Sequence, residues 1–181
     1  MGIKNIWSLN IDEALVADKL KQYVNKNDFE VFFPVNSQLK DVDLLLVNLK
    51  NDSAISIQVK GSRTYEPNRS EREKFGHGSS AWFCLSKKSV FQATNKQDYY
   101  IFVLHNIIDG NIKKEIKIDY LIIPKTDFYE ICNQKKVNGQ NKYNFFIWID
   151  EKAGRAFDFH ENGEQVIQLS QYLNTWSLLK N

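Results

Sequence analysis

Gln58 and Lys60 stand two residues apart in the segment 54–60, where apolar residues alternate with small or polar ones. Residues two apart in a strand point to the same face, so this pattern predicts one face bearing Gln58 and Lys60 and an apolar face opposite. Burying an ammonium is costly without a partner. Asp43 opens the apolar run 44–47, which predicts the neighbouring strand, and offers that partner. An acid at the start of one strand and a Gln-x-Lys at the end of the next could hold a metal ion and a water able to attack a phosphodiester.

This arrangement resembles the PD-(D/E)xK nuclease superfamily, whose signature is an Asp, a hairpin, and a strand carrying Asp, Glu or Gln two residues before Lys. The stretches 41–46 and 57–62 carry the match, and the likeness extends over residues 10–62. The middle position is Gln58 instead of Glu, as in methylation-dependent restriction enzymes of the superfamily, which removes one negative charge. The resemblance implies one domain over 1–181 with an α/β fold, a restriction-endonuclease-like three-layer sandwich with a central mixed β-sheet flanked by helices.

The resemblance also implies roles for the residues of the motif. Mg²⁺ or Mn²⁺ would be held by hard oxygens, namely Asp43, the side-chain carbonyl of Gln58 and the backbone carbonyl of Val59. Lys60 would orient the attacking water and offset charge developing on the phosphate oxygens. Asp41, two residues before Asp43, is the fallback ligand. The alternative for Asp43 is an acid at a strand start that bonds nearby backbone amides.

Glu13 has two incompatible interpretations. Asn10 can cap a helix that reaches about residue 25, and Glu13 then stands where the acid of a capping box belongs. Glu13 also lies in the middle of the apolar stripe of that helix, so its carboxylate could point at the sheet and reach the metal or its water. The stripe consists of Val16, Ala17, Leu20 and Val24. One carboxylate cannot serve both purposes at once.

Periodicity and chain breakers predict the remaining elements. Strands are expected at 29–35, 43–49, 54–60, 99–105, 116–123 and 142–149. Helices after the first are expected at 86–94, 126–133 and 171–179. Between residues 61 and 80, glycine, proline and mixed charges predict a long polar loop directly after the candidate site. The order of helix, strands, helix and strand indicates the α/β class.

The predicted loop 61–80 carries basic residues that could contact a nucleic-acid backbone. They are Arg63, Arg69, Arg72, Lys74 and His77. Three glutamates interleave with them, so a solvated loop of mixed charge is the alternative. The other two histidines, His105 and His160, have no ligand spacing and are interpreted as structural.

The composition is that of a globular protein, since 181 residues with 43% hydrophobic and 25% charged residues suit one domain. A net charge of +2 is too small to indicate a nucleic-acid binder by itself. Cys84 and Cys132 lack metal spacing and are interpreted as core residues in a reducing cytoplasm. No apolar run approaches the ~18 residues of a membrane span, so no membrane partner is expected. Frequent Lys, Asn and Ile are typical of AT-rich bacterial genomes.

The leading hypothesis is a Mg²⁺-dependent DNA endonuclease of a restriction or defence type. RNA as the substrate stays open. A catalytically inactive module of the same fold, with nucleic acid or a protein as its partner, is the alternative. Assembly into a homodimer stays open for both hypotheses. Gln58 and the small basic excess motivate this alternative, and a fold by itself does not determine a function.

Overall fold

The computed structural model describes residues 10–34, 41–91, 97–109, 114–135, 141–150, 152–159 and 166–180. Within these residues the strands form a nine-stranded sheet in the order β1-β2-β3-β4-β7-β8-β9, and β5 and β6 extend from β3. The helices are α1 (Ile11–Tyr23), α2 (Arg69–Phe75), α3 (Lys87–Val90) and α4 (Lys125–Asn133). The strands are β1 (Phe29–Phe32), β2 (Leu44–Asn48), β3 (Ala54–Tyr65), β4 (Ser79–Ser86), β5 (Tyr99–Asp109), β6 (Lys114–Pro124), β7 (Lys142–Asp150), β8 (Arg155–Phe159) and β9 (Val166–Gln168). The α/β class and the mixed sheet are therefore confirmed.

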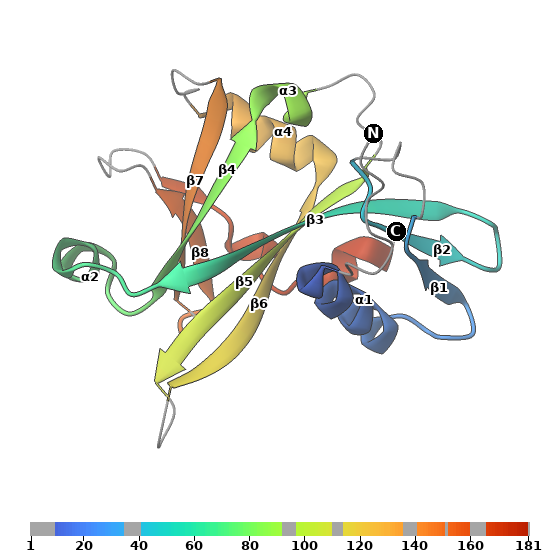
Figure 1. Ribbon diagram of the computed structural model, residues 1–181, viewed down its shortest axis with the longest axis horizontal. Helices are drawn as coiled ribbons and strands as arrows, with labels where there is room; N and C mark the ends of the chain where they lie inside the picture. Colours follow the sequence, from blue (N-terminus) through green and yellow to red (C-terminus); the bar gives the residue numbers. More distant parts are fainter. Residues whose placement is uncertain are drawn as a thin grey trace.

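Strand β3 joins two halves of the molecule. Its first part pairs antiparallel with β2 and parallel with β5, and only its end, at Thr64 and Tyr65, pairs with β4. In Figure 1, β3 crosses the molecule diagonally, with β1, β2 and α1 toward one side and β4, β7 and β8 toward the other. Because β3 has neighbours on both edges, it is an interior strand, and Gln58 and Lys60 do not belong to an edge strand that faces water.

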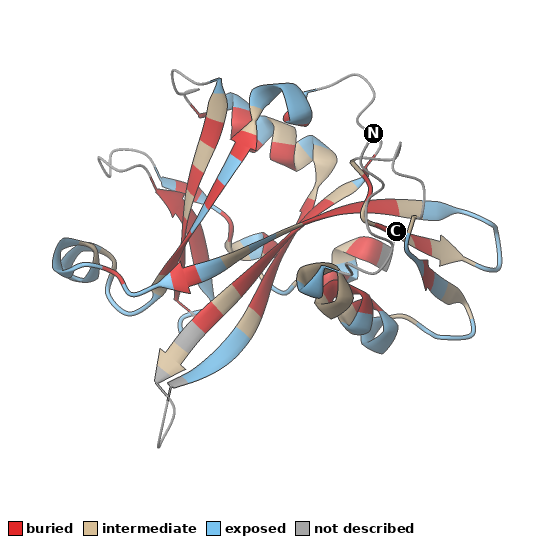
Figure 2. Cartoon of the chain, viewed as in Figure 1, coloured by how far each residue is buried: buried red, intermediate tan, exposed pale blue. Residues whose placement is uncertain are grey.

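The described residues form three apolar clusters, and the two larger ones lie on opposite faces of β3. Helix α1 packs Val16, Ala17 and Leu20 on the face of β3 that carries Ile57 and Val59. The second core lies on the other face and is rich in aromatic rings, among them Phe102, Phe128 and Phe145. Figure 2 shows buried residues along the middle of β3 and exposed residues in α2. The cores fix which face of β3 each side chain can use.

The predicted polar loop 61–80 is wrong. Strand β3 continues to Tyr65, α2 occupies 69–75 and β4 begins at Ser79. A capping box starts α2, because the Asn68 side chain accepts from the Glu71 N–H and the Glu71 carboxylate accepts from the Asn68 N–H. The mixed charges that indicated a solvated loop are the exposed face of this helix.

The predicted closing helix 171–179 is also wrong. Two short 3₁₀ helices, Ser170–Tyr172 and Trp176–Lys180, take its place. They are separated at Asn174, whose φ of 54° lies in the left-handed region and cannot continue a helix. Strands β8 and β9 were not predicted. The predicted helix 86–94 reduces to α3, and its residues 92–94, like Val35 and His160, lie outside the described residues.

The two cysteines differ in their surroundings. Cys132 is buried, which raises the pKa of its thiol to about 12. Cys84 is exposed, so its interpretation as a core residue is wrong. In the described parts of the chain, none of the helices combines the length and apolarity that crossing a membrane requires.

Candidate active site

A β-bulge positions Asp43 at the start of β2. The Asp43 N–H donates to the Ile57 carbonyl at 2.8 Å, while Leu44 is the register partner of the same residue. Asp43, which directly precedes β2, and Leu44 therefore both oppose Ile57, the arrangement of a β-bulge, which redirects side chains and recurs near active sites. The Asp43 carboxylate turns to β3, where Oδ2 accepts from the Val59 N–H at 2.8 Å.

The amide that Asp43 binds belongs to the neighbouring strand and not to the nearby residues that the alternative named. The other carboxylate oxygen, Oδ1, has no hydrogen bond from the described residues. The Val59 carbonyl lies on the same edge of β3, because the N–H and C=O of one strand residue point toward the same neighbouring strand. The ladder between β2 and β3 starts at Leu44 and Ile57, so it stops short of this carbonyl. A carboxylate oxygen and a backbone carbonyl thus lie together at the end of the ladder.

Gln58 and Lys60 share the face of β3 that points away from α1, as the alternation predicted. Ile57 and Val59 belong to the core beneath α1, and Gln58 and Lys60 alternate with them. Gln58 is only 8% exposed, and Lys60 is half-buried. A polar amide and an ammonium are therefore held at fixed positions on an interior strand.

The predicted ion pair between Lys60 and Asp43 is not formed. Among the described residues, no carboxylate lies within ion-pair distance of the Lys60 ammonium. A half-buried ammonium without an anion is unfavourable. The bulge explains the difference, because it directs the Asp43 carboxylate at the Val59 amide.

Helix α1 contributes a carboxylate to the sheet, but from Asp12. Oδ1 of Asp12 lies 2.6 Å from Nε2 of His105, with side-chain exposures of 15% and 20%. This carboxylate occupies the space above Gly61, where an added Cβ would lie 1.8 Å from Asp12 Oδ2. Sequence reasoning missed this contact, although a glycine inside a strand is a signal of close approach.

Glu13 does not join Gln58 and Lys60. It is half-buried on α1, and α1 packs on the opposite face of β3. The cap at Asn10 is confirmed, but its side chain accepts from the Asp12 N–H at 3.1 Å. His105, interpreted from the sequence as structural, ties this helix to β5 through Asp12.

The predicted nucleic-acid contacts are dispersed. Helix α2 lies at the end of β3 far from β2 (Figure 1), roughly 20 Å from Gln58 at 3.3 Å per strand residue. Its Arg69 is paired with Glu73 at 2.8 Å, and Lys74 lies 5.3 Å from the centre of the Phe75 ring. These residues do not surround Asp43. Arg63 is exposed on β3 itself, nearer the site.

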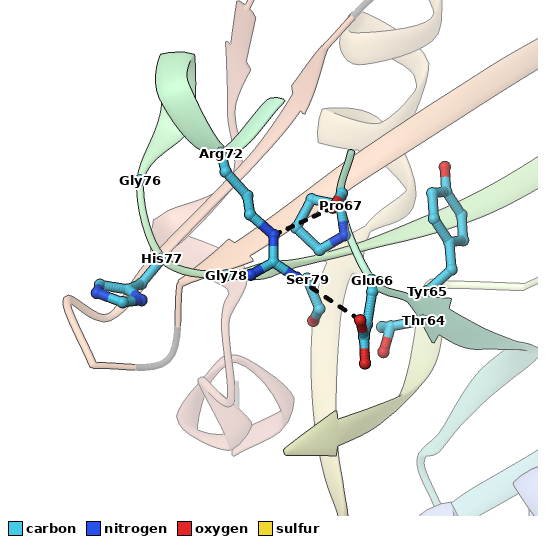
Figure 3. Close-up of a pocket in the computed structure, with 9 residues that line it drawn as sticks. All are labelled: Thr64, Tyr65, Glu66, Pro67, Arg72, Gly76, His77, Gly78 and Ser79. Atoms are coloured by element: carbon cyan, nitrogen blue, oxygen red, sulfur yellow. Dashed lines mark hydrogen bonds and ion pairs between the residues drawn. The ribbon is translucent and has the colours of Figure 1, made fainter. Parts of the chain in front are cut away.

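A pocket of about 500 Å³ lies between the end of β3, α2 and the start of β4. Figure 3 shows the Arg72 guanidinium crossing it, bonded to the Pro67 carbonyl at 3.1 Å and facing the Glu66 carboxylate at 3.7 Å. His77 points away from this pair. The lining residues are Thr64, Tyr65, Glu66, Pro67, Arg72, Gly76, His77, Gly78 and Ser79. This pocket is separate from Asp43, Gln58 and Lys60.

The chain matches none of the protein-family models with which it was compared, and neither curated proteins nor solved structures give a match. The assignment of a function therefore rests on the geometry of the site.

The donors at the end of the β2–β3 ladder are oxygens of the kind that Mg²⁺ prefers. They are Asp43 Oδ1, the Val59 carbonyl and the Gln58 side-chain carbonyl. Among the residues that the structure describes, no group of three His, Cys, Asp or Glu side chains is placed to hold a metal ion. The donor set fits Mg²⁺ in type but contains a single carboxylate, so binding would depend on oxygens from a substrate phosphate.

Proposed function

We propose that this protein is a Mg²⁺-dependent endonuclease of the PD-(D/E)xK type, with the restriction-endonuclease-like three-layer sandwich as its fold. It hydrolyses phosphodiester bonds in DNA, in the cytoplasm, in a restriction or defence role. The observation that carries the proposal is the junction of β2 and β3. There the Asp43 carboxylate is fixed beside Val59, and Gln58 and Lys60 share one face of an interior strand.

Asp43, Gln58 and Val59 are the residues that would hold the metal ion. When bound, Mg²⁺ supplies a positive charge against the phosphate and lowers the pKa of a coordinated water. The Val59 N–H keeps the Asp43 carboxylate in one orientation, so the oxygen that faces the ion is preset. Preset ligands need little reorganisation during the reaction.

Lys60 supplies the second positive charge. Its ammonium is not neutralised by a carboxylate of the described residues, so it can donate to a phosphate oxygen or to the attacking water. A compact ammonium suits contact with one oxygen better than a planar guanidinium. The same unpaired state supports an anionic substrate, because a phosphate would compensate a charge that is now half-buried.

Cleavage of plasmid DNA with and without Mg²⁺ tests the proposal. Lys60→Ala and Asp43→Asn are the informative variants, because asparagine still accepts from the Val59 N–H while it removes the charge. We expect each to lower the cleavage rate by at least about a hundredfold, as loss of a preorganised electrostatic group does. Lys50→Ala is the matched control, because Lys50 is an exposed lysine of the same hairpin and pairs with Asp28 at 2.9 Å.

If Lys60→Ala cleaves DNA at the rate of the wild type, with contaminating nuclease excluded, the proposed mechanism is wrong. Parallel RNA substrates decide between the two nucleic acids. Thermal unfolding of each variant separates a lost reaction from a lost fold.

A catalytically inactive nuclease-fold module that binds nucleic acid or a protein is the second candidate. The observation that favours it is Gln58, which leaves Asp43 as the one acid of the motif Asp43, Gln58 and Lys60. Calorimetry with Mg²⁺ distinguishes the two candidates. Absence of binding in the wild type, both alone and with a non-cleavable oligonucleotide, would favour the inactive module.

A further inference from the structure

Arg63 and Trp82 are neighbours on one face of the sheet. Tyr65 pairs with Ser80 across β3 and β4, and the Ser80 hydroxyl donates to the Tyr65 hydroxyl at 3.2 Å, so these side chains share a face. Arg63 lies two residues before Tyr65, and Trp82 lies two residues after Ser80. Because strand faces repeat every two residues, both belong to that face. They lie just beyond the paired residues Thr64 and Ala81, where the Ser62 hydroxyl still donates to the Trp82 carbonyl at 3.0 Å.

The aromatic side chains on this face are exposed, although other tryptophans of the chain are buried. Trp82 is 50% exposed and Tyr65 is 43% exposed, whereas Trp148 and Trp176 are at most 4% exposed. The residues that flank Trp82 along β4, Ala81 and Phe83, are buried on the other face. An exposed indole beside an exposed tyrosine is a surface that can bind a flat apolar ligand.

Arg63 differs from the other arginines because it has no carboxylate partner among the described residues. Arg69, Arg72 and Arg155 each face a carboxylate, at 2.8, 3.7 and 2.8 Å. Arg63 is exposed, and no carboxylate of the described residues pairs with it. An unpaired guanidinium next to an exposed indole complements a ligand that carries both an anion and an aromatic ring.

We propose that this face binds a single-stranded stretch of nucleic acid, with a base stacked on Trp82, a second near Tyr65 and a phosphate on Arg63. Stacking needs an unpaired base, because a duplex keeps its base faces covered. Arg63 follows Lys60 by three residues, so the two side chains lie on opposite faces of β3, and this binding face is separate from Gln58 and Lys60. The inference goes beyond the proposed function, because it assigns a binding surface for single strands on the other face of the sheet.

Binding is measured in the Lys60→Ala background without divalent metal, so that no cleavage interferes. The probe is a fluorescein-labelled twelve-nucleotide oligo(dT), with a hairpin duplex of the same length for comparison. We expect tighter binding of the single strand and a loss of about tenfold in Trp82→Ala, in line with base stacking measured elsewhere. Trp82→Phe, which keeps a stacking ring, should recover most of the affinity.

Arg63→Ala should weaken binding severalfold and reduce the slope of log affinity against log salt by about 0.7, the value for one phosphate contact on a single strand. Arg69→Ala is the matched control, because Arg69 is exposed and already paired with Glu73. It should leave both the affinity and the slope unchanged.

Cys84 gives an independent readout of position. It lies two residues after Trp82 on the same face of β4 and is exposed, whereas burial raises the pKa of Cys132 to about 12. Iodoacetamide should therefore alkylate Cys84 alone, since the thiolate is the reactive form. Saturating oligo(dT) should slow this alkylation about fivefold by restricting access to the sulfur.

Equal affinity for duplex and single strand, unchanged binding in Trp82→Ala, or an unprotected Cys84 in the presence of bound oligo(dT) would each overturn the inference. If those results accompany Lys60-dependent cleavage, the inference fails and the proposed function stands. If binding follows the expected pattern while no metal condition gives cleavage, the proposed endonuclease activity fails and the binding face stands.

Discussion

Lys135, which is buried, and Lys60, which is half-buried, lie in opposite circumstances. Lys135 and Asp158 form an ion pair in which both side chains are 1% exposed, and the Lys135 ammonium also lies 4.7 Å from the centre of the Phe145 ring. Lys60 is half-buried and has no such anion. Since an uncompensated buried charge is unfavourable, the Lys135 pair stabilises the fold, whereas the charge of Lys60 is not compensated by a carboxylate of the described residues.

The same contrast extends to the surrounding polar groups. On the side of β6, the Asp119 carboxylate accepts from Asn106 at 2.6 Å and from Asn174 at 2.8 Å, and Ser79 donates to Asn106 at 2.9 Å. These groups are mutually satisfied, which a buried polar network requires. At the β2–β3 junction, Asp43 Oδ1 and the Gln58 amide have no such partners among the described residues. The candidate site is not alone in this, because the buried side-chain amide of Gln97 and the indole N–H of Trp148 also have no hydrogen-bond partner.

The largest difference in stability is expected between two variants in which Lys135 or Lys60 is replaced by alanine. Lys135→Ala leaves the Asp158 carboxylate buried without its cation and should lower the free energy of unfolding by about 3–5 kcal/mol. Lys60→Ala removes an unpaired charge and should change it by less than about 0.5 kcal/mol. Urea unfolding measures both. Equal destabilisation by the two substitutions would mean that Lys60 is also structural.

The next largest loss of stability is expected from a substitution at the contact of α1 with β3. In Gly61→Ala the new methyl group meets the Asp12 carboxylate, which is held by His105, so we expect a loss of about 1–3 kcal/mol from overpacking. The double variant Gly61→Ala with Asp12→Ala should recover part of the loss, because the obstructing group is absent. Urea unfolding of the single and double variants checks this, and full tolerance of Gly61→Ala would show that α1 adjusts freely.

Gln58→Glu tests whether the candidate site, unlike the buried ion pair of Lys135, binds a metal ion. A second carboxylate should tighten Mg²⁺ binding about tenfold, since charge count tunes affinity at oxygen sites. Isothermal titration calorimetry measures this change. Gln168→Glu, at an exposed position of β9, is the control and should not alter Mg²⁺ affinity. If Gln58→Glu only lowers stability and binds no ion, the junction is not a metal site.

The smallest effect concerns the ion pair of Asp150 and Arg155, at 2.8 Å. Burial alone would raise the pKa of Asp150, but hydrogen bonds from Arg155 and the Ala153 amide outweigh it and hold this pKa below its ordinary value of 3.8. The pair therefore stabilises the protein above about pH 4, and its contribution disappears as the pH falls through the lowered pKa.

In Arg155→Ala, the stability difference from the wild type should be full at neutral pH and should shrink below pH 4. Denaturation at several pH values follows the difference. A difference that stays constant down to pH 2 would assign the effect of Arg155 to packing instead of charge.

Local patterns determined the parts of the site that lie within one strand. The alternation in 54–60 was enough to assign Gln58 and Lys60 to one face, and the apolar run after Asp43 was enough to predict the neighbouring strand. The capping box of Asn68 and Glu71 was equally local, but the charges around it were interpreted as a loop. Such features are readable because side-chain periodicity and capping depend on residues a few positions apart.

Only the tertiary structure decided where the charges meet. Because of the bulge, the Asp43 carboxylate binds the Val59 amide and not the Lys60 ammonium. A shift of one residue changes the neighbours of every side chain in a strand. The contact between Asp12 and His105 joins positions 93 residues apart. The sequence determined which residues each strand presents, and the packing of α1 and the register of β2 against β3 decided which of them are paired.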